Sequence, residues 1–452
     1  MAVARRRQAF PRLSARRPAL LLLTAAALLL AGCGSSPETT GPQAPAVSGA
    51  PDGGDSAAGV PDAGSSSAAR DRRAGGSPSG SGSARPARRQ PGVPAPPDRG
   101  TPRGRASGID LILDEMGLSG QIGQHFIMPL ETPGVSEATR KRIQLVSPAG
   151  YILYPWNVRD RGQLRELTAE LRQLTRETTG QRPFIAVDQE GGRVQALRID
   201  SLHEHPAASH MGAYDDPAYM EAVGYVTGVE LASLGITMNF APVLDLQGDL
   251  DRGGRGVIGD RALAPSPETV AELGLAYAEG LRRAGVIPVA KHFPGHGATA
   301  VDSHGSLPTV SASLDELREA HLLPFVEAAK AQIPAVMTAH IRYPAVEKEL
   351  PVTLSRRWLQ DILRGELGFT GVVVTDAMEM RAIADNYSLK EALYRGLQAG
   401  VNLFLLTAWI DPVEARNTVA RLVAQGIVSE AQIREGARRV LELKAQFGLL
   451  TN

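Results

Sequence analysis

Residues 108–452 contain eight short apolar segments typical of buried strands, and this repetition constrains the fold more than any other feature of the chain. The segments are 124–129, 150–154, 184–188, 237–244, 287–291, 335–339, 371–375 and 401–406. Helical patterns lie between them at 163–178, 217–234, 267–284, 314–332, 355–367 and 389–399, with a last one after Asp411. Alternating strands and helices indicate an α/β fold with parallel strands, and eight units predict a (β/α)8 TIM-type barrel. An open doubly wound sheet is the structural alternative.

Charged or imidazole side chains follow five of the predicted strands in succession. They are Asp188, Asp245, Lys291 with His292, His340 and Asp376. Active sites of such barrels lie where the strands end, so these residues are predicted to meet at one mouth. A single residue of this kind is more often structural, but five at one rim indicate a site.

The densest motif is Lys291-His292-Phe293-Pro294-Gly295-His296-Gly297, followed by Asp302-Ser303-His304. Proline and glycine exclude a helix here, so the histidines are not a helical zinc pair, and we expect no metal and no cofactor. In an extended chain Asp302 and His304 point the same way. The carboxylate can then fix the imidazole tautomer and raise its pKa, as suits a general acid.

Two further segments carry carboxylates to the predicted mouth. Residues 371–375 form a buried strand that ends at Asp376, whose carboxylate can stabilise or attack a developing positive centre. Capping of the following helix is the structural alternative for this residue. Asp188 precedes a Gly-Gly turn and an arginine, a combination that suits hydroxyl-rich ligands, and Asp245 and Arg261 add an acceptor and a donor.

Together these motifs resemble glycoside hydrolase family 3, in particular its β-N-acetylhexosaminidase branch, over essentially all of 108–452. The resemblance implies Asp376 as the nucleophile, His304 as the acid/base and Asp302 as its partner. It assigns the sugar hydroxyls to Asp188, Arg261, Lys291 and His292. The implied activity is retaining hydrolysis of terminal β-linked N-acetylglucosamine, with peptidoglycan fragments as the expected substrate.

One position departs from that branch, because Ala196 stands where its members usually carry a sugar-contacting arginine, with Arg193 and Arg198 nearby. Two other functions stay open. A histidine acid/base removes one negative charge from the site, which would admit phosphate as the acceptor and make the enzyme a β-N-acetylglucosaminide phosphorylase. A non-catalytic, wall-glycan-binding lipoprotein is the alternative from another class.

The first 107 residues have a different composition. Six arginines, an apolar run at 19–30 and the sequence Leu30-Ala31-Gly32-Cys33 resemble a bacterial lipoprotein signal, which predicts cleavage after residue 32 and lipidation of Cys33. Residues 33–107 are rich in Gly, Ser, Ala and Pro and predict a disordered linker. We therefore expect a catalytic domain at 108–452, lipid-anchored on the outer face of the cell membrane.

Charge and cysteine content exclude other classes of protein. The chain has 48 basic and 48 acidic residues, and since residues 1–107 hold 15 of the basic and 6 of the acidic ones, the predicted domain carries a net charge of −9. Such a domain offers no basic field for nucleic acid, and a carbohydrate is the expected partner. The single cysteine excludes an internal disulfide.

Overall fold

The computed structural model describes residues 102–200, 202–247, 257–299, 301–407 and 409–451, with side chains from residue 108 onward. The predicted signal peptide, Cys33 and the predicted linker up to residue 101 lie outside the described residues. Helix α1 (Pro102–Gly123) begins slightly before the predicted domain boundary. Among the described helices, none combines the length and apolar character that a membrane span requires.

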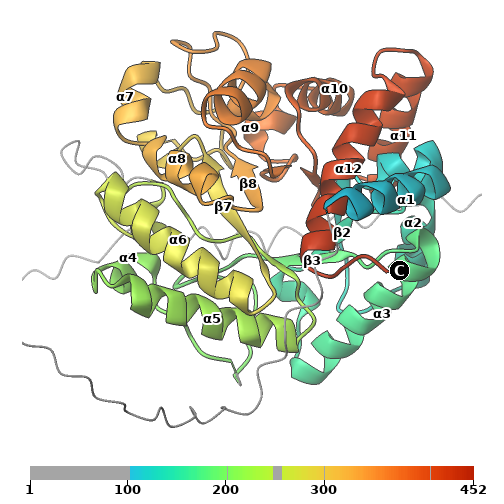
Figure 1. Cartoon of the computed structure of the whole chain (residues 1–452), viewed down its shortest axis with the longest axis horizontal. Coiled ribbons are helices and arrows are strands. Elements are labelled where there is room, and N and C mark those ends of the chain that lie inside the picture. Colours follow the sequence, from blue (N-terminus) through green and yellow to red (C-terminus); the bar gives the residue numbers. More distant parts are fainter. Residues whose placement is uncertain (1–101, 201, 248–256, 300, 408, 452) are drawn as a thin grey trace, which may run out of the picture. The chain divides into compact units, whose positions relative to one another are not determined.

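Eight parallel strands form a nearly closed barrel, which confirms the predicted fold (Figure 1). The strands are β1 (Phe126–Pro129), β2 (Gly150–Ile152), β3 (Phe184–Val187), β6 (Met238–Asn239), β7 (Ile287–Phe293), β8 (Ala335–Thr338), β9 (Val372–Thr375) and β10 (Phe404–Leu405). From β1 to β9 each strand pairs with the next in chain order, and β10 pairs with β1. The seam between the last two strands is joined by a parallel bridge between Val374 and Leu403. All eight strands fall within the segments predicted from the sequence or extend them by at most two residues.

The strands are buried on both faces, as parallel strands in a barrel require. In β3, Phe184 and Ala186 belong to the cluster inside the barrel, whereas Ile185 and Val187 pack in the larger cluster that contains the surrounding helices. This alternation explains why the strand segments are continuous apolar runs rather than alternating ones.

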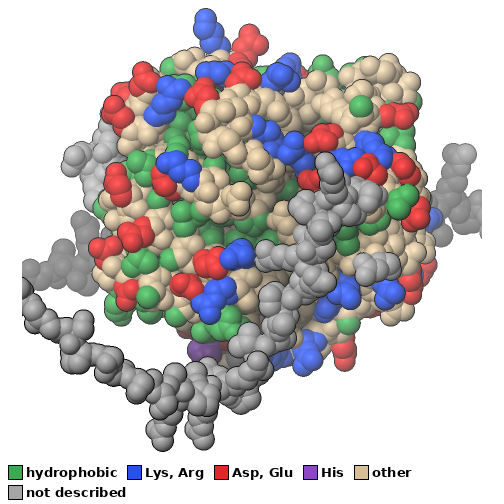
Figure 2. All heavy atoms as spheres, viewed as in Figure 1, with side chains coloured by type: hydrophobic (Ala, Val, Ile, Leu, Met, Phe, Trp, Pro, Cys, Tyr) green, Lys and Arg blue, Asp and Glu red, His purple; other side chains and the backbone are tan. Residues whose placement is uncertain are grey.

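Helices surround the barrel (Figure 1), and acidic and basic side chains are interspersed on the face of the molecule that Figure 2 shows. The longer ones are α2 (Glu137–Val146), α3 (Arg161–Thr179), α5 (Pro217–Ser233), α6 (Pro267–Arg283), α8 (Leu323–Lys330), the π-helix η7 (Arg357–Glu366), α10 (Leu389–Ala399), α11 (Pro412–Ala424) and α12 (Glu430–Gln446). Short helices are α4 (Ala208–Gly212), α7 (Leu314–Glu319) and α9 (Arg381–Ala384), with 3-10 turns at η2 (Pro155–Asn157), η4 (Gly259–Arg261), η5 (His296–Ala298) and η6 (Val352–Leu354).

Several helical details differ from the prediction, among them α1, which was not predicted, and the pattern after Asp411, which is two helices, α11 and α12. Helix α2 was not predicted, because its many charged residues leave only Thr139, Ile143 and Val146 buried, too few for a clear periodicity. The helix expected at 314–332 is two helices, α7 and α8. The helix expected at 355–367 is present with π-type hydrogen bonding.

A small antiparallel hairpin, β4 (Gln189–Gly191) and β5 (Val194–Gln195), follows β3 at the carboxyl end of the barrel. Its turn uses Gly191 at φ 102° and Gly192 at φ 55°, values that residues with a side chain rarely adopt. The predicted sharp turn after Asp188 is therefore present, and it brings Glu190 back over the strand end.

Candidate active site

Asp188, Glu190, Arg261 and Lys291 form one network of charges at the carboxyl ends of β3 and β7. Lys291 Nζ lies 2.6 Å from both Asp188 Oδ1 and Glu190 Oε1. Arg261 donates two hydrogen bonds to Glu190, each 2.8 Å long. Burial alone would raise the pKa of Glu190, but the charges of Lys291 and Arg261 hold it well below its usual range. The Asp188 side chain is 32% exposed and that of Lys291 only 2%, so Asp188 is the member open to a ligand.

Asp245 holds the two histidines of the densest motif in place. Its side chain is fully buried, and Oδ2 accepts from His292 Nδ1 at 2.6 Å. Oδ1 accepts from the backbone N–H groups of His292 and His296 at 3.1 and 2.6 Å. Burial would raise the pKa of Asp245, yet the adjacent His292 lowers it to about 2. Because its oxygens are occupied, Asp245 orients His292 instead of facing the mouth.

The predicted Asp302–His304 pair is present in the loop after β7. Asp302 Oδ1 accepts from both the backbone N–H and the Nδ1 of His304, at 2.9 and 2.8 Å. This hydrogen bond, with a smaller contribution from Asp376, raises the pKa of His304. Both side chains are exposed, at 53% for Asp302 and 74% for His304.

Ser303, between the two, anchors this exposed pair to the barrel. It is buried, and its hydroxyl lies 3.1 Å from His296 Nε2. Its carbonyl accepts from the backbone N–H of Ala382, in the segment that follows β9. The loop is thus tied to the strand it leaves and to the segment beyond Asp376.

Asp376 directly follows β9 and is partly buried. Its Oδ1 accepts from the N–H of Ala377 at 2.8 Å. Burial would raise its pKa, but the neighbouring His292, His340 and His304 lower it, so the carboxylate is ionised. Asp376 in turn contributes to the raised pKa of His304, so the charge of each residue affects the other.

His340 occupies the strand end between those of His292 and Asp376. Its ring is fully buried, with Nδ1 2.7 Å from Thr353 Oγ1 and Nε2 3.0 Å from the Ala377 carbonyl. Burial lowers the pKa of His340, so the neutral ring is favoured. His340 thus fixes the backbone next to Asp376.

Three residues near the mouth were not predicted from the sequence. Tyr154 follows β2, and its pKa is raised by burial and by the charges of Asp188, Glu379 and Asp376. Trp156 stacks on Tyr154, with ring centroids 4.4 Å apart, and is 51% exposed. Burial, with a smaller effect of Asp376, raises the pKa of Glu379 to about 7. Their positions shortly after strands β2 and β9 are the sequence feature that could have identified all three as residues of the mouth.

Arg193 and Arg198, the two arginines near Ala196, support the loop that carries Arg261. Ala196 is buried in the core. Arg193 pairs with Asp260 at 3.0 Å and donates to the carbonyl of Ile258, and Arg198 donates to the carbonyl of Arg193. Within the described part of the chain, no group of three or more His, Cys, Asp or Glu side chains is arranged to hold a metal ion.

Comparison with known proteins identifies relatives of this chain. Residues 120–443 match the glycosyl hydrolase family 3 N-terminal domain. The chain is 40% identical to a beta-hexosaminidase of Alkalilimnicola ehrlichii over 64% of its own length and 82% of that protein. It is 37% identical to beta-hexosaminidase A of Pseudoalteromonas piscicida, over 59% of this chain, but spans only 46% of that protein.

Among solved structures, the family 3 beta-N-acetylglucosaminidase of Paenibacillus superposes with a TM-score of 0.71 at 37% identity. The match covers 74% of this chain and 64% of that one.

Proposed function

Because the chain belongs to glycosyl hydrolase family 3, we propose that it is a β-N-acetylhexosaminidase that releases terminal β-linked N-acetylglucosamine. The observation that supports the proposal is the Asp302–His304 hydrogen bond, in a loop whose Ser303 carbonyl bonds the segment that follows Asp376. The identity of the sugar, N-acetylglucosamine, is inferred from the names of the relatives.

In the proposed first step, Asp376 attacks the anomeric carbon while the bond to the leaving oxygen breaks. Since Asp302 occupies Nδ1 of His304, the Nε2–H is the proton that passes to that oxygen. A covalent aspartyl ester and a free alcohol result. The hydrogen bond to Asp302 raises the pKa of His304, which favours the protonated ring that this step requires.

In the proposed second step, His304 is neutral and takes a proton from water at the same nitrogen. The water oxygen bonds to the anomeric carbon, the ester bond to Asp376 breaks, and the sugar leaves with its β configuration retained. Each residue thus returns to its starting protonation state.

The remaining groups of the mouth are proposed to bind the sugar. Asp188 is the most open member of the charged network and suits a pair of hydroxyl groups. Lys291, Arg261 and His292 add donors, while Glu190 keeps the two cations in position. Peptidoglycan fragments are the proposed natural substrate, supported by the export signal predicted at the start of the chain.

The test is hydrolysis of an aryl N-acetyl-β-glucosaminide, with Asp114→Asn as a matched surface control on α1. Asp376→Asn is expected to abolish turnover, because an amide cannot form the glycosyl ester that the proposed mechanism requires. A 5-fluoro glycosyl fluoride of N-acetylglucosamine should label Asp376 in the wild-type protein, as detected by peptide mass spectrometry. Full activity of Asp376→Asn, or labelling of a different residue, would remove Asp376 from the mechanism.

A further inference from the structure

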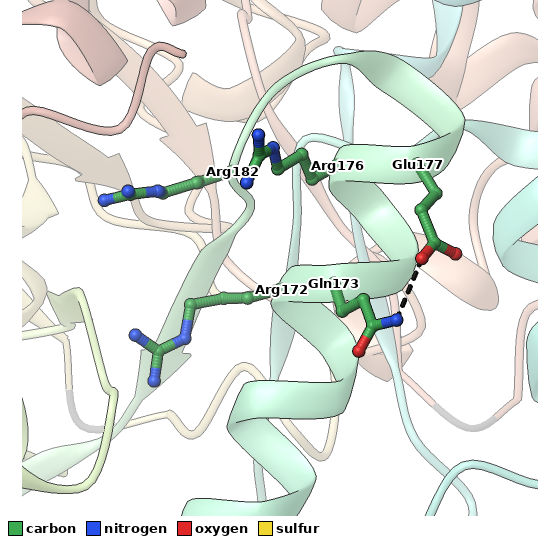
Figure 3. A pocket seen from close by; sticks show the side chains of 5 residues that line it. All are labelled: Arg172, Gln173, Arg176, Glu177 and Arg182. Atoms are coloured by element: carbon green, nitrogen blue, oxygen red, sulfur yellow. Dashed lines mark hydrogen bonds between the residues drawn. The ribbon is translucent and has the colours of Figure 1, made fainter.

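A group of basic side chains lines a hollow of about 420 Å³ on the amino-terminal side of β3, away from the barrel mouth. Its lining residues are Arg172, Gln173, Arg176, Glu177 and Arg182. Four of them lie in the last two turns of α3, and Arg182 precedes β3 by two residues. Figure 3 shows the three arginines extending to one side, while Gln173 and Glu177 pair with each other on the other.

The three guanidinium groups have no carboxylate partner among the described residues. Arg172 Nε donates to the Thr168 carbonyl at 3.2 Å, and within the described part of the chain no ion pair involves Arg172, Arg176 or Arg182. The one acidic residue of the hollow, Glu177, accepts a 2.9 Å hydrogen bond from the Gln173 amide. Most of the N–H donors of these arginines are therefore available to a ligand.

The arginines form a local excess of positive charge. Burial lowers the pKa of Arg172, and the adjacent charge of Arg182 lowers it further. Glu177 offsets one charge, and the carboxyl end of α3 offsets about half of another, which leaves a positive excess.

Arg172 is also held in position. Its guanidinium packs against Gly235, where an added Cβ would lie 2.2 Å from Arg172 Nη2. Gly235 has φ +83° and therefore suits glycine on conformational grounds as well. Together with the bond to Thr168, this contact fixes one guanidinium at the edge of the hollow, so less side-chain freedom is lost when a ligand binds.

We propose that this hollow binds a phosphate-class oxyanion through Arg172, Arg176 and Arg182. Guanidinium groups match the oxygens of phosphate in paired hydrogen bonds, which an ammonium group cannot reproduce. The hollow is larger than inorganic phosphate, so the phosphate of a soluble ester or of a lipid headgroup also fits. The site is independent of the glycosidase mechanism.

The test is calorimetric titration of the full chain with inorganic phosphate and with pyrophosphate at low ionic strength. The double variant Arg172→Gln, Arg182→Gln is expected to lose at least tenfold in affinity. The double variant Arg159→Gln, Arg165→Gln removes the same charge from exposed positions around the start of α3 and should bind like the wild type. Hexosaminidase activity and melting temperature, unchanged in both, would show that the fold is intact.

Vesicles of phosphatidylglycerol and of phosphatidylcholine separate the two sources of phosphate. Arginine-dependent sedimentation with the anionic vesicles alone identifies a lipid headgroup, and phosphate binding without sedimentation identifies a soluble ester; both outcomes support the site. Equal phosphate affinity in the wild type and both double variants would mean that the anion binds at another site, such as the barrel mouth. That result, or no binding to the wild type at about 10 mM phosphate, would overturn the proposal.

Discussion

Removing the carboxylate of Asp302 is the sharpest test of the proposed acid/base. In Asp302→Ala, His304 loses the acceptor that bonds both its Nδ1 and its backbone N–H. At the observed exposure, an ion pair of this kind contributes about 0.2–1 kcal/mol. One pKa unit corresponds to about 1.4 kcal/mol. The pKa of His304 should therefore fall by less than about one unit, and the basic limb of kcat/KM should move to lower pH by that amount.

The orientation of the ring should matter more than its pKa. A positioned general acid contributes about 10²–10⁴-fold, so kcat/KM for a disaccharide should fall by up to that factor. A dinitrophenyl glycoside needs no proton on its leaving oxygen, so its kcat/KM should change little. Asp302→Asn, which retains an oxygen acceptor without the charge, should shift the pH limb but lose less activity. Equal losses on both substrates, with an unmoved basic limb, would refute the acid role of His304.

Two buried groups give predictions for stability. Burial lowers the pKa of Lys444 from 10.5 to about 7, and its one hydrogen bond, 2.8 Å long, goes to Gln124. The unfolded chain binds this proton more tightly than the folded one, so the free energy of unfolding rises with pH between these two pKa values. Lys444→Met removes the titrating group. Its gain in free energy of unfolding over the wild type should therefore be about 2–3 kcal/mol larger at pH 6 than at pH 9. Glu379 has a pKa raised to about 7, so its ionisation opposes folding as pH rises from 4.5 to 7. The free energy of unfolding of Glu379→Gln, relative to that of the wild type, should therefore increase by about 2 kcal/mol between pH 5 and pH 8. Urea unfolding at each pH checks both, and differences that do not vary with pH would contradict them.

The strands and the strand-end residues were predictable because each depends on a local pattern. A continuous apolar run ending in Asp188 or Asp376 indicates both a doubly buried strand and the edge where its side chain emerges. The Asp302–His304 bond was predictable for a similar reason, since two residues one position apart in an extended chain share a side.

The contacts that support the site depend on tertiary structure and were not predictable. Glu190 reads as one more polar loop residue, yet the turn of the β4–β5 hairpin places it between Lys291 and Arg261, which lie 101 and 71 positions further along the chain. Asp245 reads as a ligand for sugar, whereas its burial beneath His292 is set by how two neighbouring strands pack. Ser303 has no recognisable sequence pattern, although it anchors the loop that carries Asp302 and His304.

The charge of the mouth bears on whether water or phosphate accepts the sugar. The carboxylates of the site are those of Asp188, Glu190, Asp245, Asp302 and Asp376, and its permanent cations are Lys291 and Arg261. In the proposed mechanism, this negative excess would stabilise the positive charge that develops at the anomeric carbon in the transition state. It also opposes the approach of an anionic acceptor after the leaving group departs, whereas a neutral water is not repelled. We therefore expect free N-acetylglucosamine as the product even when phosphate is present, and formation of the sugar 1-phosphate would show that the histidines around Asp376 outweigh the carboxylates.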